Sequence, residues 1–250
     1  MADYKFGVPS YKRSDRAHTI PTLAALGYSR ENIVVSVQTE SDYREYVTAY
    51  GDKATIIFKE ASNCAQNRNT LIDHFDDGEK FIMLDDDVKS FCRLEEINGK
   101  KCFSRISSKQ QLNKVFDNMF TYCKSHKSPI WAWYPTPNAF FMNHTIDRRN
   151  LFVATILGIV NNKSFRFNEA FDLKEDLEIS LRLMKLGYNA IRFNGYTVEA
   201  NHLSKGGCED ARAAGHNAQR CKELLAMYPG LIKPSHRPDE IRFVKKGTAK

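Results

Sequence analysis

The stretch KFIMLDDDV, Lys80–Val88, joins four consecutive apolar residues to three consecutive acids. The apolar run Phe81–Leu84 has the length of a strand and no polar face, which is typical of a parallel strand covered on both sides. A buried strand cannot hold three adjacent carboxylates in the core, so we expect Asp85, Asp86 and Asp87 to emerge at its carboxyl end. Ligands of open α/β sheets bind at that edge.

The acidic triplet suggests a metal site. Alternate residues at a strand end point the same way, so Asp85 and Asp87 can share one hard cation that is also held by a diphosphate. The alternative is a solvated acidic turn. We favour the metal site, because crowded carboxylates are costly without a cation.

The bulk properties predict a cytoplasmic globular protein. With 250 residues, 42% of them hydrophobic, the chain can bury a full core and is most simply one domain. There is no apolar run of membrane-spanning length and no signal-peptide core, so we expect no membrane partner. Six cysteines without a CxxC pair are typical of reduced thiols. The net charge of +7 is compatible with a polyanionic partner, although many basic proteins bind none.

The first ~90 residues alternate strand and helix four times, which indicates a parallel, doubly wound sheet. Ser41 and Asn63 are the predicted N-caps of the second and third helices. Neither GxGxxG nor GxxxxGK[ST] occurs, so there is no dinucleotide fingerprint and no P-loop. The strands before the triplet strand are expected at Lys5–Val8, Ile33–Val37 and Ala54–Phe58.

The pattern changes after the triplet. A hairpin is expected around Asn98-Gly99, and an aromatic stretch follows a helix capped by Ser108. The remaining elements are expected as a strand at Phe152–Val160, a helix from about Lys174 to Gly187, strands at Ala190–Phe193 and Thr197–Ala200, and a last helix at about Asp210–Tyr228.

Two acids, Glu175 and Asp176, fall in the first turn of the helix that begins near Lys174. Carboxylates there stabilise the helix N-terminus. Alternatively, one of them faces the substrate cleft as a general base. The spacing leaves both interpretations open.

Three further side chains also have two interpretations. His202 is a candidate third metal ligand or a packed histidine. Lys205, in the loop Lys205-Gly206-Gly207, can close on phosphates or belong to an ordinary surface turn. Arg68, near a helix N-terminus, can reach a phosphate or base, or form a surface ion pair.

Several motifs recur in the order of a known family. VPSYKR follows the first strand, QNRN lies on the third helix, LDDDV follows the fourth strand, and KEDLEISLRL precedes Asn201-His202. Together they resemble the GT-A glycosyltransferases, which are nucleotide-sugar enzymes, over essentially the whole chain. The resemblance implies one α/β domain with a Rossmann-like, mostly parallel sheet flanked by helices. Residues 1–90 would be the nucleotide-sugar-binding half and 91–250 the acceptor-side half.

The resemblance also implies roles for individual residues. Asp85 and Asp87 would hold Mn²⁺ or Mg²⁺ against the diphosphate, with Asp87 the expected direct ligand and His202 the late metal-binding histidine. Asp176, next to Glu175, would be the base of an inverting transfer. The residues expected to contact the nucleotide-sugar donor are Pro9, Ser10, Tyr11, Arg13, Gln38, Glu40, Arg68, Asp85, Asp86 and Lys205.

Within this family, YKFGVPSYKR, IMLDDDV and FNEAFDLKEDLEISLRL look most like the TET/JBP-associated glycosyltransferases of phages, relatives of the base J glucosyltransferase. That likeness implies UDP-glucose as donor and host cytoplasm as location. The implied acceptor is the hydroxymethyl group of 5-hydroxymethylcytosine or 5-hydroxymethyluracil in DNA. A base in a duplex has to be flipped to reach a pocket. Trp131, Trp133 and Tyr134 could stack on it, although such residues more often belong to the core.

Other functions remain open from the sequence. A GT-A enzyme acting on a protein, glycan or small molecule would make the basic surface incidental. A non-catalytic DNA-binding module is disfavoured by the intact candidate site, Asp85, Asp87, Asp176 and His202. A nucleotidyltransferase would be expected to carry a Gly-rich basic loop after the first strand, and VPSYKRSDR has no glycine.

Overall fold

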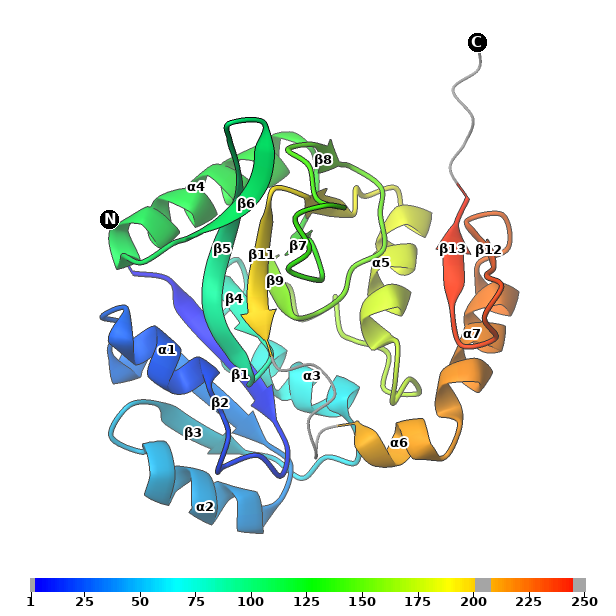
Figure 1. The fold of residues 1–250 in the computed structure, drawn as a ribbon. Helices are drawn as coiled ribbons and strands as arrows, with labels where there is room; N and C mark the ends of the chain where they lie inside the picture. Colours follow the sequence, from blue (N-terminus) through cyan, green and yellow to red (C-terminus); the bar gives the residue numbers. More distant parts are fainter. Residues whose placement is uncertain (1–2, 201–207, 245–250) are drawn as a thin grey trace.

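The computed structural model describes residues 3–200 and 208–244. Its centre is an eight-stranded sheet (Figure 1). In spatial order the strands are β3 (Thr55–Phe58), β2 (Ile33–Val37), β1 (Lys5–Ser10), β4 (Lys80–Leu84), β9 (Ile156–Val160), β7 (Ile130–Trp133), β10 (Ile191–Phe193) and β8 (Ile146–Asp147). The first four are parallel, as predicted. β9 runs antiparallel to both β4 and β7, β10 is parallel to β7, and β8 is antiparallel to β10.

Strand β4 is apolar on successive residues because both of its faces are covered. Ile82 and Leu84 pack in one hydrophobic cluster, whereas Phe81 and Met83 pack in a second cluster on the other face. All four side chains are fully buried. The prediction of a doubly covered strand that ends at the acidic triplet is therefore confirmed.

Helices cover the two faces of the sheet and make a three-layer α/β/α fold. The first cluster contains Ile20, Tyr46 and Phe116, which belong to α1 (Thr19–Ala25), α2 (Glu40–Tyr50) and α4 (Lys109–Ser125). The second contains helix residues from α3 (Cys64–His74), α5 (Glu175–Lys185) and α7 (His216–Met227). A short helix, α6 (Glu209–Ala213), precedes α7, and a 3₁₀ turn, Arg30–Asn32, precedes β2.

Two small sheets complete the fold. Strands β5 (Val88–Ile97) and β6 (Lys100–Arg105) form the predicted hairpin, which pairs with β11 (Tyr196–Ala200). Asn98 and Gly99 both have positive φ, 52° and 72°, as a tight hairpin turn requires. Near the C-terminus, β12 (Ile232–Pro234) pairs with β13 (Ile241–Phe243), and Figure 1 shows both at the edge of the molecule.

The predicted helix starts are confirmed in two cases and wrong in one. The side chains of Asn63 and Ser108 accept hydrogen bonds from the N–H groups of Gln66 and Gln111. The N-cap of α2 is Thr39, not Ser41, because its side chain accepts from the Asp42 N–H and the helix already begins at Glu40. No helix in the two described segments is both long and apolar enough to cross a membrane.

Two predicted elements are shorter than expected. The strand expected from Phe152 begins at Ile156, where its pairing with Leu84 of β4 begins; beyond this pair, Asp85 N donates one more hydrogen bond to the carbonyl of Thr155. The last helix is divided into α6 and α7 at Gly215, whose φ of +78° is left-handed.

Candidate active site

A cavity of about 500 Å³ opens at the carboxyl ends of the parallel strands. Ser10 ends β1, Gln38 follows β2 and Asp85 follows β4, so three neighbouring strands direct side chains to one edge. The first turns of α3 and α5 and part of α6 complete the wall. The predicted site residues that line this cavity are Pro9, Ser10, Tyr11, Arg13, Gln38, Arg68, Asp85, Asp86, Glu175 and Asp176.

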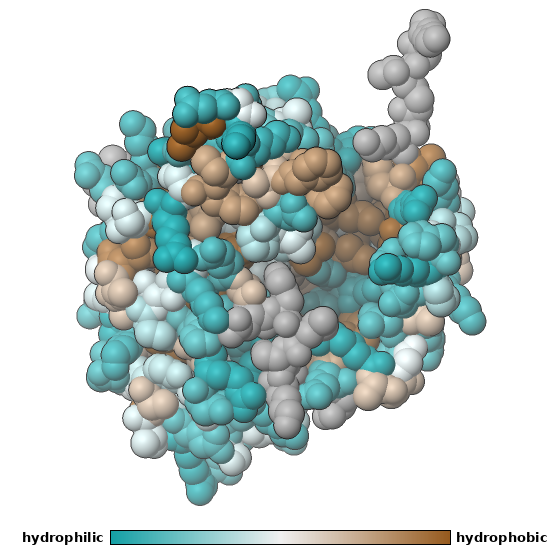
Figure 2. All heavy atoms as spheres, in the orientation of Figure 1, coloured by the Kyte–Doolittle hydropathy of each residue, from teal (hydrophilic) through white to brown (hydrophobic). Residues whose placement is uncertain are grey.

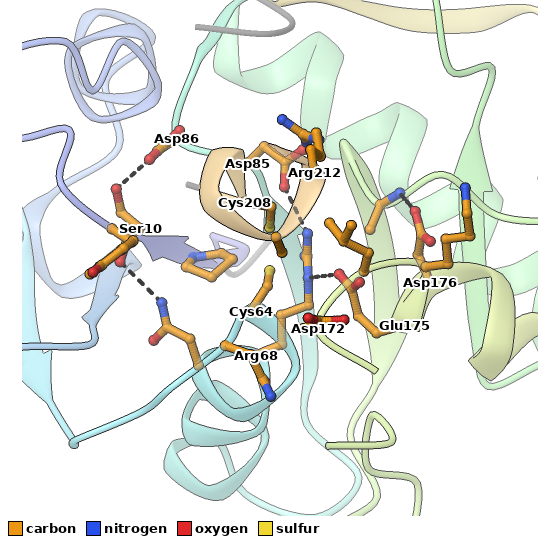
Figure 3. A pocket seen from close by; sticks show the side chains of 18 of the residues that line it. Ser10, Cys64, Arg68, Asp85, Asp86, Asp172, Glu175, Asp176, Cys208 and Arg212 are labelled. Atoms are coloured by element: carbon orange, nitrogen blue, oxygen red, sulfur yellow. Dashed lines mark hydrogen bonds and ion pairs between the residues drawn. The ribbon is translucent and has the colours of Figure 1, made fainter. Parts of the chain in front are cut away.

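Arg68 is the central cation of this cavity. It lies in α3, is 4% exposed, and its Nη2 is 2.8 Å from Asp85 Oδ1. Its Nε is 3.1 Å from Glu175 Oε1, so one guanidinium joins α3, the end of β4 and the start of α5 (Figure 3). The third nitrogen, Nη1, is buried and makes no hydrogen bond to the described residues. Arg68 therefore forms a buried ion pair rather than the surface pair considered from the sequence, and one of its N–H groups is left without a hydrogen bond to the described residues.

Asp86 connects the end of β1 and the loop that follows it to the end of β4 through an ion pair and a hydrogen bond. It is 4% exposed, Arg13 Nη1 lies 2.8 Å from its Oδ1, and the hydroxyl of Ser10 donates to its other oxygen. Burial raises the pKa of Asp86, and the Arg13 guanidinium opposes that shift by favouring the ionised form. The pair shapes the cavity, because it sets where Tyr11 and Arg13 lie.

The two carboxylates predicted to share a cation occupy different environments. Asp85 lines the cavity with its side chain 35% exposed, and Asp87 is 7% exposed and is not among the described lining residues. The described residues contain no group of three or more His, Cys, Asp or Glu side chains arranged to hold a metal ion. His202, the predicted third ligand, and Lys205 lie outside the described residues. The shared cation site stays a prediction.

The carboxylates nonetheless fit a hard divalent cation chemically. Mg²⁺ and similar ions prefer oxygen ligands and are usually held by one or two carboxylates plus substrate phosphates. Asp85 uses Oδ1 to accept from Arg68, and its Oδ2 has no hydrogen bond to a described residue. One oxygen of Asp85 is thus available on the cavity side.

The two acids of the first α5 turn have different partners. Glu175 is 6% exposed and ion-paired to Arg68. Asp176 accepts hydrogen bonds from backbone N–H groups, from Ala154 at 3.0 Å and from Leu177 at 2.7 Å, and so faces the segment before β9. Burial raises the pKa of Asp176 above its ordinary value. Burial also raises the pKa of Glu175, so the two acids differ in their partners rather than in the direction of their shifts: Glu175 is ion-paired with Arg68, and the hydrogen bonds of Asp176 come from the backbone.

Sequence reasoning missed several residues of this cavity. Asn67, the second residue of the QNRN motif, is 1% exposed. Its Nδ2 donates to the carbonyls of Ser10 and Ser36, each at 3.1 Å, and so joins α3 to the ends of β1 and β2. Cys64 and Cys208 both line the cavity, with their side chains close to one another (Figure 3), and this proximity raises the pKa of the Cys64 thiol and lowers that of Cys208. Only the QNRN motif gave a signal for Asn67, and the two cysteines gave none because they are far apart in the chain.

Other predicted residues do not line the cavity. Glu40 is exposed on the first turn of α2 and ion-paired with Arg44 at 2.6 Å. Trp131 and Trp133 are fully buried in the first cluster, which confirms them as core residues. Tyr134, the next residue after β7, is half-buried and lines a different cavity.

Comparisons with known proteins identify the family of this chain and a protein of similar fold. Residues 4–207 match the model of a family described as TET-Associated Glycosyltransferase. A mannosyltransferase, PcManGT from Pyrobaculum calidifontis, solved in complex with GDP-Man and Mn²⁺, superposes with a TM-score of 0.56 at 14% identity over 94% of this chain. This chain spans 66% of that protein. A CMP:2-keto-3-deoxy-manno-octonic acid synthetase complexed with CTP gives a TM-score of 0.46 at 14% identity, over 89% of this chain and all of the other. A comparison with curated protein sequences finds no match.

Proposed function

Since this chain belongs to the TET-associated glycosyltransferase family, we propose that it transfers a sugar, with UDP-glucose the first choice of donor, to the hydroxymethyl group of a modified pyrimidine in DNA. One observation carries the proposal. A single cavity at the carboxyl edge of the sheet brings together Asp85, Arg68 and Asp176, from β4, α3 and α5. Such a transfer requires an acid to hold a cation, a buried cation to face an anion, and a second acid to accept the proton of the acceptor hydroxyl.

The donor is proposed to bind between β1 and α3. The ends of β1 and β2 supply Ser10, Tyr11 and Gln38, and α3 begins at the cavity with its N–H groups directed toward it. The unsatisfied Nη1 of Arg68 can donate to a phosphate oxygen of the donor. Support for a nucleotide sugar also comes from the fold, because the similarly folded mannosyltransferase was solved with GDP-Man and Mn²⁺.

A divalent cation is proposed to be held by Asp85 and Asp87, with His202 as a further ligand. Such an ion neutralises the charge that develops on the departing diphosphate. Within this chain, the Arg68 guanidinium acts in the same direction, because it holds Asp85 at the cavity and adds a fixed positive charge there.

Asp176 is proposed to be the general base. The acceptor hydroxyl oxygen forms a bond to the anomeric carbon of the sugar while the bond from that carbon to the diphosphate oxygen breaks. The hydroxyl proton passes to Asp176, and the electron pair of the broken bond leaves with the nucleoside diphosphate. Attack from the face opposite the leaving group inverts the anomeric carbon.

The experiment that tests the proposal combines purified protein with Mn²⁺ and a panel of UDP-sugars that also includes GDP-mannose. The acceptors are DNA carrying 5-hydroxymethylcytosine or 5-hydroxymethyluracil, and nucleosides are analysed by mass spectrometry. We expect a hexose-sized mass gain on one of the two bases, abolished by EDTA.

Other outcomes would revise the proposal in different ways. Transfer to protein, glycan or small-molecule acceptors, with none to either modified DNA, would reject the DNA acceptor and leave glycosyl transfer standing. An absence of both product and nucleoside diphosphate release would reject the catalytic proposal itself.

A further inference from the structure

A second cavity, of about 750 Å³, adjoins the first. The two share Val153, Lys174 and Leu177, and the last two flank Glu175 and Asp176 in the sequence. Its other walls come from the segment between β7 and β8, from β10, and from residues 239–243, which include β13. The last of these walls lies beyond residues 4–207, the part that matches the family model.

The lining of the second cavity combines aromatic rings and cations with three acids, Asp147, Asp239 and Glu240. Asp147 is paired with Arg192 at 3.4 Å and Glu240 with Arg237 at 3.1 Å. Tyr134 and Phe141 line it, and the guanidinium of Arg192 lies 5.3 Å from the centre of the Tyr134 ring. Arg149 and Lys174 also line it, and neither has an ion-pair partner among the residues that the structure describes. Flat apolar surfaces next to unmatched cations suit a ligand that carries both a planar ring and an anion.

Two neighbouring phenylalanines stand at the rim of this cavity. Phe140 is 80% exposed and Phe141 is 63% exposed, in an edge-to-face arrangement with ring centres 5.0 Å apart. The arginine pair Arg148-Arg149 follows them before β9. Figure 2 shows apolar side chains gathered on the upper half of the viewed face, beside a hollow in the surface. Two adjacent, highly exposed phenyl rings indicate a surface that becomes covered by a partner.

We propose that the second cavity binds the acceptor nucleotide after it has been rotated out of a DNA duplex, and that Phe140 fills the space it leaves between the neighbouring bases. This inference rests on the proposed function. An extruded base requires a pocket with a stacking surface, and the duplex requires an apolar side chain in the vacated position. Phe141 supplies the stacking surface, and Arg149 and Lys174 contact the phosphates on either side.

The shared wall explains how the acceptor meets the donor. Asp176 accepts a hydrogen bond from Ala154 N, next to Val153, and Leu177 follows it in the wall. A hydroxymethyl group that enters from the second cavity therefore reaches the Asp176 side of the first cavity. The stacked base stays on the far side of Val153, away from the ion pairs of Arg68.

The closing experiment compares Phe140→Ala with the wild type on two acceptors, a duplex with one 5-hydroxymethylpyrimidine and the same strand alone. We expect transfer to the duplex to fall by about tenfold, the size of losing one base–aromatic contact, and transfer to the single strand to stay within about twofold. The matched control is Phe58→Ala, because Phe58 is a 42% exposed phenylalanine on β3 that lines neither cavity. It should leave both rates unchanged.

A second measurement does not depend on transfer. A duplex with 2-aminopurine at the target position should gain fluorescence on binding the wild type, and this gain should be lost with Phe140→Ala. If Phe140→Ala lost transfer equally on the duplex and the single strand, or lost it on neither, the inference would be overturned. The proposed function would still hold in that case, provided that the wild type transfers sugar to the DNA. If the wild type modifies only a protein or glycan acceptor, the proposed function fails and the inference fails with it.

Discussion

The two cavities on either side of the first α5 turn are built from different chemistry. In the first, Arg68 is buried and paired at 2.8 Å with Asp85 and at 3.1 Å with Glu175. In the second, Phe141 is 63% exposed and Arg149 has no ion-pair partner in the described part of the chain. The polar side chains of the first cavity are held in place by ion pairs to one another. The second cavity exposes an aromatic ring and a cation that a bound ligand would bury.

The difference separates the tasks of the two sites. A preorganised polar site binds a small charged ligand with little rearrangement. Exposed rings and cations gain most when a large anionic partner buries them. Substitutions in the first cavity should therefore change the turnover of the donor and the free energy of unfolding. Substitutions in the second cavity should change only the binding and use of the acceptor.

The largest effect is expected at the boundary between the two cavities, at Asp176. Asp176→Asn keeps the size of the side chain but removes the proton acceptor, so transfer should fall by roughly 10²–10⁴-fold. The single amide oxygen of Asn can accept from only one of the two backbone N–H groups, those of Ala154 and Leu177, that now donate to the carboxylate. Donor binding, measured by calorimetry with UDP-glucose and Mn²⁺, should change little. The control is Asp52→Asn, because Asp52 is exposed beyond α2 and paired with Lys53.

The pH dependence gives an independent test of the same residue. A base must be ionised to accept a proton, and burial raises the pKa of Asp176. Transfer should therefore fall as the pH falls through that pKa, at a higher pH than for an ordinary aspartate. Near-normal transfer by Asp176→Asn, or a retained anomeric configuration, would show that the proton goes elsewhere.

The next largest effect is expected on the free energy of unfolding, when Arg68 of the first cavity is replaced. Arg68→Met removes the cation between Asp85 and Glu175 and leaves Glu175 buried without its counter-charge, which should cost about 3–5 kcal/mol of unfolding free energy. The exposed pair of Arg44 and Glu40 provides the control, since Arg44→Met should cost at most about 1 kcal/mol. Urea unfolding measures both. Equal costs for the two variants would mean that the first cavity is not preorganised.

The fold could be predicted because its signals are local. The all-apolar run Phe81–Leu84 and the caps at Asn63 and Ser108 depend on neighbouring residues, and the structure confirms them. The cap at Ser41 was wrong because Thr39, two residues earlier, is an equally good capping residue, and the sequence alone does not rank them. The break at Gly215 was missed because an isolated glycine is tolerated in many helices.

The site could be predicted only in part, because its geometry depends on long-range contacts. Asp85 and Arg68 were identifiable from their motifs, but their pairing joins β4 to α3 through the tertiary fold. Spacing also does not show that Glu175 pairs with Arg68 while Asp176 accepts from Ala154 N, because both partners come from other parts of the chain. Of the second cavity, only Tyr134 was named from the sequence, as a side chain that could stack on a base. The other walls come from separate segments that include residues 239–243, so no motif marks them.

The smallest effect is expected at Glu40, which the family resemblance put in the nucleotide pocket. Glu40 is exposed and paired with Arg44 at 2.6 Å, and it is not among the described residues that line the cavity. Glu40→Ala should therefore change the KM for the donor by less than about twofold, as for surface substitutions without a specific role. Gln38→Ala is the comparison, because Gln38 is 7% exposed and lines the cavity. A larger rise in KM for Glu40→Ala than for Gln38→Ala would mean that the start of α2 moves toward the donor on binding, so that the first cavity is less preorganised than its ion pairs indicate.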